Sequence, residues 1–192
     1  MRNKWVFPVL FLFCGMGFSE LVIERIAIRG TSFYLSVRTF PSSDFNPFLF
    51  FQGGNTLAVG YDIRVFKKAL FPERDLFLTN IKVRYEIKKD YLNEAYVAHV
   101  WYGWEFAYKR WIESDEKLLR FLYGLENFRA FSFTGATDED YFYLEVSQFF
   151  DSESGPEKEN DIVGTFFRSL LGMRYEISPV RSRVFNKNGI FK

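Results

Sequence analysis

The chain has 192 residues, of which 25 are basic and 24 acidic, so its formal net charge is +1. A nucleic-acid-binding surface needs a concentrated basic patch that displaces counterions, and this near-neutral mixture of charges predicts no nucleic-acid partner. Aromatic side chains make up 21% of the chain, a composition that favours the half-buried surfaces of β-sheets.

Residues 1–19 have the features of a secretory signal peptide. Two basic residues precede an apolar run from Val6 to Phe13. The small residues Gly17 and Ser19 occupy the third and the first position before a cleavage site at Glu20. A membrane-spanning helix needs about 17 to 25 apolar residues, more than this run provides. The sequence therefore predicts export to the periplasm or beyond the cell, and no transmembrane helix in the mature chain.

Cys14 is the only cysteine of the chain and leaves a second form of processing open. Bacterial lipoproteins are cleaved just before a lipidated cysteine, although that site favours a small preceding residue and Phe13 stands there. Cleavage after Ser19 removes Cys14, so we expect neither a disulfide nor a thiolate metal site in the mature protein. The glycine motifs that bind phosphate are also absent from the sequence, and no cofactor is predicted.

Alternation of apolar and polar residues predicts a single, mainly β domain over residues 20–192. The expected architecture is a β-sandwich or a strongly bent antiparallel sheet with two short α-helices. The aromatic residues around Phe48 predict that part of the loop from Pro41 to Asn55 packs down as a helical turn. Gly103 either bends one long strand or closes a hairpin, and both interpretations stay open. Strands are expected at residues 22–29, 32–38, 57–65, 81–87, 95–102, 104–112, 128–133 and 141–149, with an edge strand within 173–185.

One helix is expected after Ser114. Ser114 is a favourable N-cap, two acidic residues follow in the first turn, where the helix dipole favours anions, and Gly124 ends the pattern. Leu118 and Leu122 recur at helical spacing. The helix should therefore cover one face of the sheet.

A second helix is expected from Asn160 or Asp161 to Gly172. Its apolar stripe is broad, and packing in the core is the expected role. Contact with a partner or a membrane is the alternative, with Phe166 and Phe167 as candidate binding residues, although the basic face of a membrane-surface helix is missing. The stripe consists of Ile162, Val163, Phe166, Phe167, Leu170 and Leu171.

Candidate catalytic residues are few. His99 is the only histidine and lies in an expected strand, where a structural or surface role is more common than catalysis. Asp138, Glu139 and Asp140 are clustered, but adjacent carboxylates in a turn are usually just solvated. We therefore predict that the chain is not an enzyme and that it holds no metal.

The remaining candidate binding residues form one aromatic cluster in the middle of the chain. Flat rings on a sheet stack on sugars or anchor a protein partner with little loss of conformational entropy. On one continuous strand, Tyr102, Trp104 and Tyr108 share a face. Trp101 and Trp111 then point to the other face, so at least half of the cluster is expected to belong to the core.

A further pattern combines the order of elements with a loose spacing of tyrosine and aspartate. A leader and an N-terminal strand pair precede a Gly-Gly loop, two strands, a tyrosine-containing turn, a short helix and another strand. The segments concerned are Gly53-Gly54, Leu57–Ile63, Val83–Ile87, Asp90–Val97 and Tyr141–Val146. From Leu21 to Phe150 this layout resembles the bacterial envelope family called domain of unknown function 4390. The resemblance implies an exported envelope protein and supplies no catalytic residue, and the tail from Asp161 departs from it.

These observations predict an exported, non-enzymatic component of the periplasm or envelope that binds or assembles with a partner. An envelope protein or a glycan is the expected partner, with peripheral membrane contact as a further option. Two alternatives stay open, a hydrolase acting on envelope carbohydrate through carboxylates and a lipid-carrying β fold. Two facing carboxylates in a cleft would favour the first, and a continuous apolar interior open at one end would favour the second.

Cleavage at the predicted site defines the N-terminus of the mature protein. N-terminal sequencing of the exported protein is expected to begin at Glu20, because the small residues that the processing enzyme requires lie just before it. Recovery of a chain that begins at a lipidated Cys14, or of an uncleaved chain held in the membrane, would contradict this prediction.

Overall fold

The structure is a computed structural model of the chain, and it describes residues 19–43, 45–69, 73–153 and 175–188. Within these ranges the chain forms two antiparallel β-sheets, one α-helix and one 3-10 helix. The mainly β class predicted from the alternating sequence is confirmed. No helix in the described ranges is long and apolar enough to cross a membrane.

The smaller sheet contains the two predicted N-terminal strands, which form a hairpin. Gly30 has a φ of 60° between its first two strands, a left-handed conformation that glycine adopts without steric cost. Phe33, Leu35 and Val37 alternate along one face and are at most 1% exposed, as their spacing predicts. In the order of pairing, the strands are β1 (Glu20–Arg29), β2 (Ser32–Phe40) and β7 (Gly124–Ser132).

The larger sheet has seven strands in the order β10-β8-β3-β4-β5-β6, with β9 also paired to β8. Alternate residues of β3 from Leu57 to Val65 are all buried, and β3 pairs with β4 as an adjacent antiparallel strand. The strands are β3 (Thr56–Lys68), β4 (Leu76–Asp90), β5 (Ala95–Tyr102), β6 (Glu105–Ile112), β8 (Tyr141–Glu153), β9 (Tyr175–Arg181) and β10 (Phe185–Asn186).

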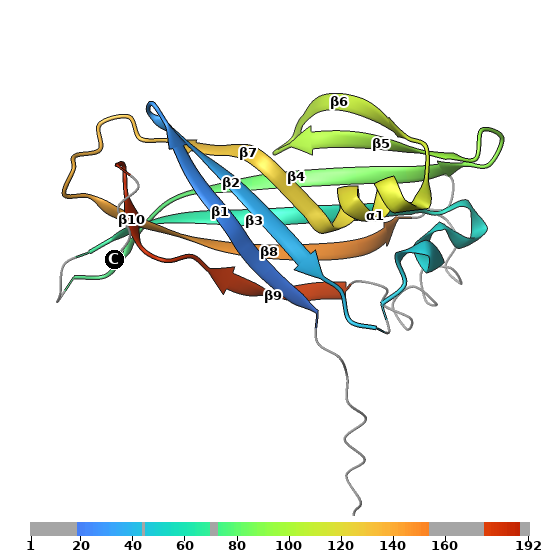
Figure 1. Cartoon of the computed structure of the whole chain (residues 1–192), viewed down its shortest axis with the longest axis horizontal. Coiled ribbons are helices and arrows are strands. Elements are labelled where there is room, and N and C mark those ends of the chain that lie inside the picture. The colour runs from blue at the N-terminus through green and yellow to red at the C-terminus, as the bar shows by residue number, and fades with distance from the viewer. Residues whose placement is uncertain (1–18, 44, 70–72, 154–174, 189–192) are drawn as a thin grey trace, which may run out of the picture.

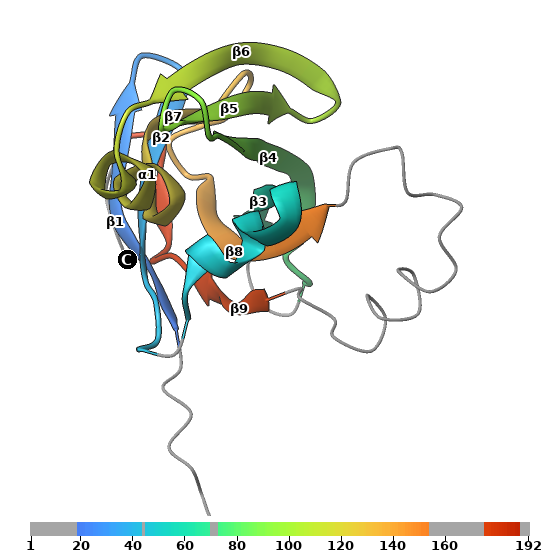
Figure 2. The same cartoon turned by 90° about the vertical axis from the view of Figure 1, so that its right-hand side faces the viewer.

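The two sheets enclose a hydrophobic core. Figure 1 shows β1 and β2 crossing the long strands of the larger sheet at an angle. Figure 2 shows the larger sheet curled from β9 to β6, with β1, β2 and the helix α1 (Asp115–Tyr123) on its open side. The ring of Phe33 lies 5.6 to 5.9 Å from those of Phe131, Phe133 and Phe185. Aromatic side chains from both sheets therefore pack against one another, and this core accounts for part of the high aromatic content of the chain.

The helix α1 begins and ends where the sequence predicts. The Ser114 hydroxyl caps it by accepting a hydrogen bond from the amide three residues later at 3.3 Å. Asp115 in the first turn accepts a hydrogen bond of 2.6 Å from the hydroxyl of the buried Tyr96. Leu118 and Leu122 have no exposed surface. The helix therefore packs on the larger sheet, as expected.

One backbone carbonyl at the C-terminal end of α1 binds side chains of the larger sheet. The Leu122 carbonyl accepts hydrogen bonds from the Tyr61 hydroxyl of β3 at 3.1 Å and from the side-chain amide of Gln148 of β8 at 2.9 Å. The Thr39 hydroxyl of β2 donates in turn to Oε1 of the Gln148 side chain. All three side chains are buried, and burial raises the pKa of Tyr61 well above its usual value, so its hydroxyl stays a donor. The helix and both sheets are thus linked by a single polar network.

The loop from Pro41 to Asn55 contains the predicted helical turn. It is the 3-10 helix η1 (Pro47–Gly54), and the side chain of Asn46 caps it by accepting a hydrogen bond from the amide two residues later at 3.0 Å. Phe50 and Phe51 are buried against the core. The aromatic residues of this loop therefore extend the core at one end of the larger sheet.

Several element boundaries add to or correct the prediction. β7 begins at Gly124, earlier than the predicted Phe128, because the chain passes directly from the helix into extended backbone and pairs there with Arg38 of β2. Gly103 closes a hairpin, which decides between the two interpretations left open. The expected C-terminal edge strand is β9, in which Pro179 lies at a register shift, where a missing N–H is tolerated.

Two predicted segments fall on residues outside those that the structure describes. The signal peptide occupies residues 1–19, of which only Ser19 is described. The second helix, expected from Asn160 to Gly172, includes the candidate residues Phe166 and Phe167. Both segments therefore stay predictions.

Leu122→Ala should lower the free energy of unfolding by about 2 to 5 kcal/mol, because it removes a fully buried side chain where α1 packs on the sheet. Leu92→Ala is the matched control, since it removes the same atoms from a side chain that is 95% exposed, and its effect should stay below about 0.5 kcal/mol. Urea denaturation followed by circular dichroism measures both. Equal effects of the two substitutions would contradict the burial of this helix face.

Candidate functional site

The predicted aromatic cluster lies on the hairpin of β5 and β6. Gly103, with a φ of 61°, and Trp104 form its turn. The strand register then shifts at Ala107, which adds one residue to β6. The face toward α1 is called the inner face, and the opposite one the outer face. Tyr102 and Tyr108 lie on the inner face, Trp101 and Trp111 lie on the outer face, and Trp104 stands in the turn.

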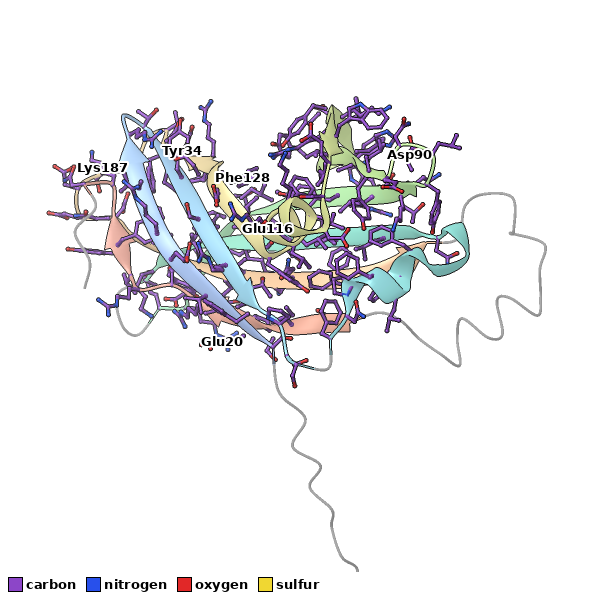
Figure 3. The ribbon with its side chains drawn as sticks, turned by 45° about the vertical axis from the view of Figure 1, so that its right-hand side comes forward. Glu20, Tyr34, Asp90, Glu116, Phe128 and Lys187 are labelled. Carbon is purple, nitrogen blue, oxygen red and sulfur yellow. The ribbon has the colours of Figure 1, made fainter. Side chains whose placement is uncertain are left out.

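A groove of about 830 Å³ lies on the inner face, between the hairpin and the pair of α1 and β7. Figure 3 labels Phe128 of β7, which lines the groove, and Glu116 on the helix α1, whose Lys117, Arg120 and Phe121 line it as well. Tyr102 joins the two sides, with its ring 5.5 Å from that of Phe128. We call this hollow the aromatic-basic groove. Its lining includes Tyr85, Tyr102, Tyr108, Arg110, Lys117, Arg120, Phe121, Glu126, Phe128 and Arg129.

Three tyrosines and two phenylalanines form the aromatic part of the groove. The ring of Tyr85 lies 4.5 Å from that of Phe121 on α1. Burial raises the pKa of both Tyr85 and Tyr102, and the neighbouring Tyr108 raises both pKa values further. The hydroxyls of Tyr85 and Tyr102 therefore stay protonated at neutral pH, and each offers a hydrogen-bond donor and an acceptor.

Basic side chains surround these rings. The lining has four of them, Arg110, Lys117, Arg120 and Arg129, against the single carboxylate of Glu126. The guanidinium of Arg110 lies 5.3 Å from the ring centroid of Phe121, and no described carboxylate forms an ion pair with it. Lys117 and Arg120 do pair, with acidic residues one helical turn earlier, but all four partners are at least 62% exposed. Such exposed pairs are weak, so these two cations stay available to a ligand.

The outer face of the same hairpin borders a second hollow, the outer cavity, of about 400 Å³. Trp101 and Trp104 line it, and Trp101 packs edge-on against Phe106 with ring centroids 5.3 Å apart. Trp111 is also on this face but does not line the cavity, and it carries the Lys109 ammonium 4.9 Å from its ring centroid. The hairpin therefore divides the predicted cluster between two hollows.

Two of the three carboxylates in the predicted cluster, Asp138 and Asp140, have structural partners. Asp138 pairs with Lys187 after β10 at 3.1 Å. Asp140 pairs with Lys67 of β3 at 2.6 Å and accepts a hydrogen bond from the Thr137 amide at 2.9 Å. The bond from Lys187 holds the pKa of Asp138 below its usual range, and the bond from Lys67 does the same for Asp140. These carboxylates fasten the turn between β7 and β8.

Other groups that could carry chemistry are dispersed. The His99 ring lies on the outer face of β5, 5.9 Å from the ring of Phe106. Among the described residues, no group of three or more His, Cys, Asp or Glu side chains could hold a metal ion. Glu126 is the only carboxylate in the lining of the aromatic-basic groove, so a second carboxylate for acid–base chemistry is not available there.

Sequence reasoning missed the residues that complete the groove. Arg110 follows Tyr108 by two residues on β6 and so shares its face, which was a usable signal. Phe121, an aromatic residue between Leu118 and Leu122 in the predicted helix, was a second usable signal. The approach of Arg129 and Phe128 from β7 depends on how two sheets pack, which no local periodicity reports.

Searches against protein-family models, curated proteins and solved structures find no match to this chain. The resemblance to domain of unknown function 4390 therefore stays a prediction. The geometry of the aromatic-basic groove and of the outer cavity is what bears on function.

The pKa of Asp140, lowered by Lys67, predicts a pH-dependent contribution to stability. A carboxylate whose pKa is lower in the folded than in the unfolded chain stabilises the fold above the unfolded value, near 3.9, and loses this effect as the pH falls through the folded value. Asp140→Asn should therefore be less stable than the wild type at pH 7, and the difference should shrink as the pH falls below about 4.

Urea denaturation between pH 7 and pH 3 measures this difference. Glu139→Gln is the control, because this neighbouring carboxylate is exposed and makes none of the bonds described for Asp140. A stability difference for Asp140→Asn that stays constant over the whole pH range would show that the ion pair contributes nothing.

Proposed function

We propose that the protein is an exported, non-enzymatic binding protein of the periplasm or envelope and that the aromatic-basic groove is its ligand site. The ligand class is an anionic oligosaccharide, a chain of rings that carries several negative groups. The observation that carries the proposal is the arrangement of Tyr102, Tyr108 and Arg110 side by side on the inner face of the hairpin.

The two tyrosines offer surface for sugar rings. Tyr102 is 42% exposed and Tyr108 is 43% exposed, so part of each side chain remains accessible to a ligand. Aromatic faces provide a large contact area at little entropy cost, and phenol hydroxyls pair with sugar hydroxyls as donors or acceptors. A chain of rings fits this lining better than a compact ion does.

The charges favour an anion. Arg110 is held against Phe121, which fixes a cation beside the two tyrosines. Arginine binds carboxylates through paired, charge-assisted hydrogen bonds, the strongest polar contacts that a surface groove offers. Lys117 and Arg120 add two further cations. Their ion pairs are exposed and weak, so exchanging them for contacts with a ligand costs little free energy.

Hydrolysis of carbohydrate has less support. The outer cavity holds carboxylates, including Asp62 of β3 and Glu86 of β4. Asp62 pairs in register with Lys82 whereas Glu86 pairs with Ala58, so the two lie four residues apart along the strands, about 13 Å. Carboxylate pairs that cleave glycosides lie about 5 to 10 Å apart.

A lipid carrier also has less support. It would need a continuous apolar interior open at one end. The space between the two sheets is instead filled by large side chains such as Phe33, Tyr61 and Phe150, each at most 1% exposed. Binding at the surface of the fold agrees better with this packing.

Arg110→Gln should weaken binding of a uronic-acid hexamer by about tenfold or more, because it removes a charge-assisted hydrogen bond to the ligand. Lys109→Gln is the matched control, since it makes the same change in net charge at the neighbouring position on the opposite face. Isothermal titration calorimetry at two salt concentrations measures both, and a neutral glucose hexamer is the control ligand. Failure of the wild type to bind the uronic-acid hexamer, or equal losses in both variants, would contradict the proposal.

A further inference from the structure

The outer cavity lies on the opposite face of the hairpin from the aromatic-basic groove. Its volume of about 400 Å³ lies in the range of small-molecule sites, about 300 to 1,000 Å³. Trp101 lines the outer cavity while the next residue, Tyr102, lines the groove. The outer cavity is therefore a separate hollow, and its role is independent of the ligand proposed above.

A single row of paired residues forms the floor of the outer cavity. Phe149 of β8 pairs with Gly60 of β3, Gly60 pairs with Arg84 of β4, and Arg84 pairs with Trp101 of β5. A Cβ atom on Gly60 would lie 2.2 Å from the ring of Phe149, so the glycine leaves room for this ring to lie over the strand. Two aromatic side chains thus flank a guanidinium along this row of the sheet.

Two buried polar atoms in the lining have no hydrogen-bond partner among the described residues. One is Oδ1 of Asp62, an acceptor, and the other is Nε1 of Trp101, a donor. Buried polar atoms are nearly always paired in folded proteins, so each orphan atom needs an explanation. A molecule that brings both a donor and an acceptor would satisfy the two together.

The charges around these atoms are largely compensated. Arg84 lies 3.3 Å from the carboxylate of Glu86, and Asp62 lies 3.6 Å from the guanidinium of Arg64. The cavity therefore lacks the surplus of one sign that would hold an ion, in contrast to the aromatic-basic groove. A neutral ligand fits this lining better than a charged one.

We infer that the outer cavity binds one neutral sugar residue. A sugar hydroxyl both donates and accepts hydrogen bonds, so two separate hydroxyls of one ring match the acceptor Asp62 Oδ1 and the donor Trp101 Nε1. The apolar face of the ring stacks on an indole, and Trp104, 92% exposed at the hairpin turn, stands at the cavity for this contact. Both orphan atoms are covered in the free protein, so binding requires the side chains that cover them to shift.

The test compares substitutions that keep the shape of a side chain and remove or weaken one of its hydrogen-bonding groups. Trp101→Phe keeps an aromatic ring against Phe106 and removes the N–H donor, and Asp62→Asn keeps the size of the side chain and removes its charge. Trp111→Phe is the matched control, because it makes the same change on the same face outside the outer cavity. The probes are neutral tetrasaccharides of glucose, galactose, mannose and N-acetylglucosamine, titrated by calorimetry and by tryptophan fluorescence.

At least one neutral tetrasaccharide should bind the wild type, and both substitutions should weaken that binding about tenfold or more. The thermal unfolding midpoint of Trp101→Phe should stay unchanged or rise, because this variant loses a buried polar atom that has no partner among the described residues of the free protein. Trp111→Phe should leave binding intact.

Two results would overturn the inference. One is the absence of binding of all four tetrasaccharides to the wild type at millimolar concentration. The other is unchanged binding in Trp101→Phe. This variant is a sufficient test by itself if Asp62→Asn fails to fold. Neither variant should alter binding of the uronic-acid hexamer, so failure here is distinguishable from failure of the proposed function.

Discussion

The carbonyl of Leu122 is the point on which the arrangement of helix and sheets depends. It is one of the last carbonyls of α1, which have no partner within the helix. Tyr61 and Gln148 donate to it from two strands of the larger sheet, and Thr39 of the smaller sheet donates to Gln148. Rotation or sliding of α1 would leave these buried groups unpaired, which is costly in an apolar interior. The network therefore holds the end of the helix in one position between the two sheets.

The position of α1 in turn shapes the aromatic-basic groove. Phe121 directly precedes Leu122, and its ring meets both Tyr85 and Arg110. Gly124 follows the helix in extended backbone and starts β7 without a connecting loop. The strand β7, which forms the side of the groove opposite the hairpin, therefore leaves the helix in a fixed direction. A groove built on helix and strand is better preorganised than one built on loops, because its side chains do not need to be ordered on binding.

The local sequence pattern predicts the helices and strands of this fold better than it predicts the contacts between them. Alternation buries the residues of β3, and the cap at Ser114 with the spacing of Leu118 and Leu122 defines α1, because both depend on neighbouring residues alone. The same alternation puts Gln148 on the buried face of β8, but its partner Leu122 lies 26 positions earlier in the chain. The groove likewise unites residues of β4, β5, β6, α1 and β7, so it follows from sheet packing and not from any one segment.

The β5–β6 hairpin concentrates exposed aromatic side chains where the core does not need them. In β6 every residue except Ile112 is exposed, although Phe106, Tyr108 and Trp111 are large and apolar or amphipathic. Elsewhere in the described chain, rings such as Phe33 are fully buried and stabilise the fold by packing. Exposed apolar surface of this kind lowers solubility and gains nothing for stability, whereas contact with a ligand or partner puts it to use. Because neighbouring residues of a strand point to opposite faces, one hairpin supplies such surface to two hollows that differ in charge.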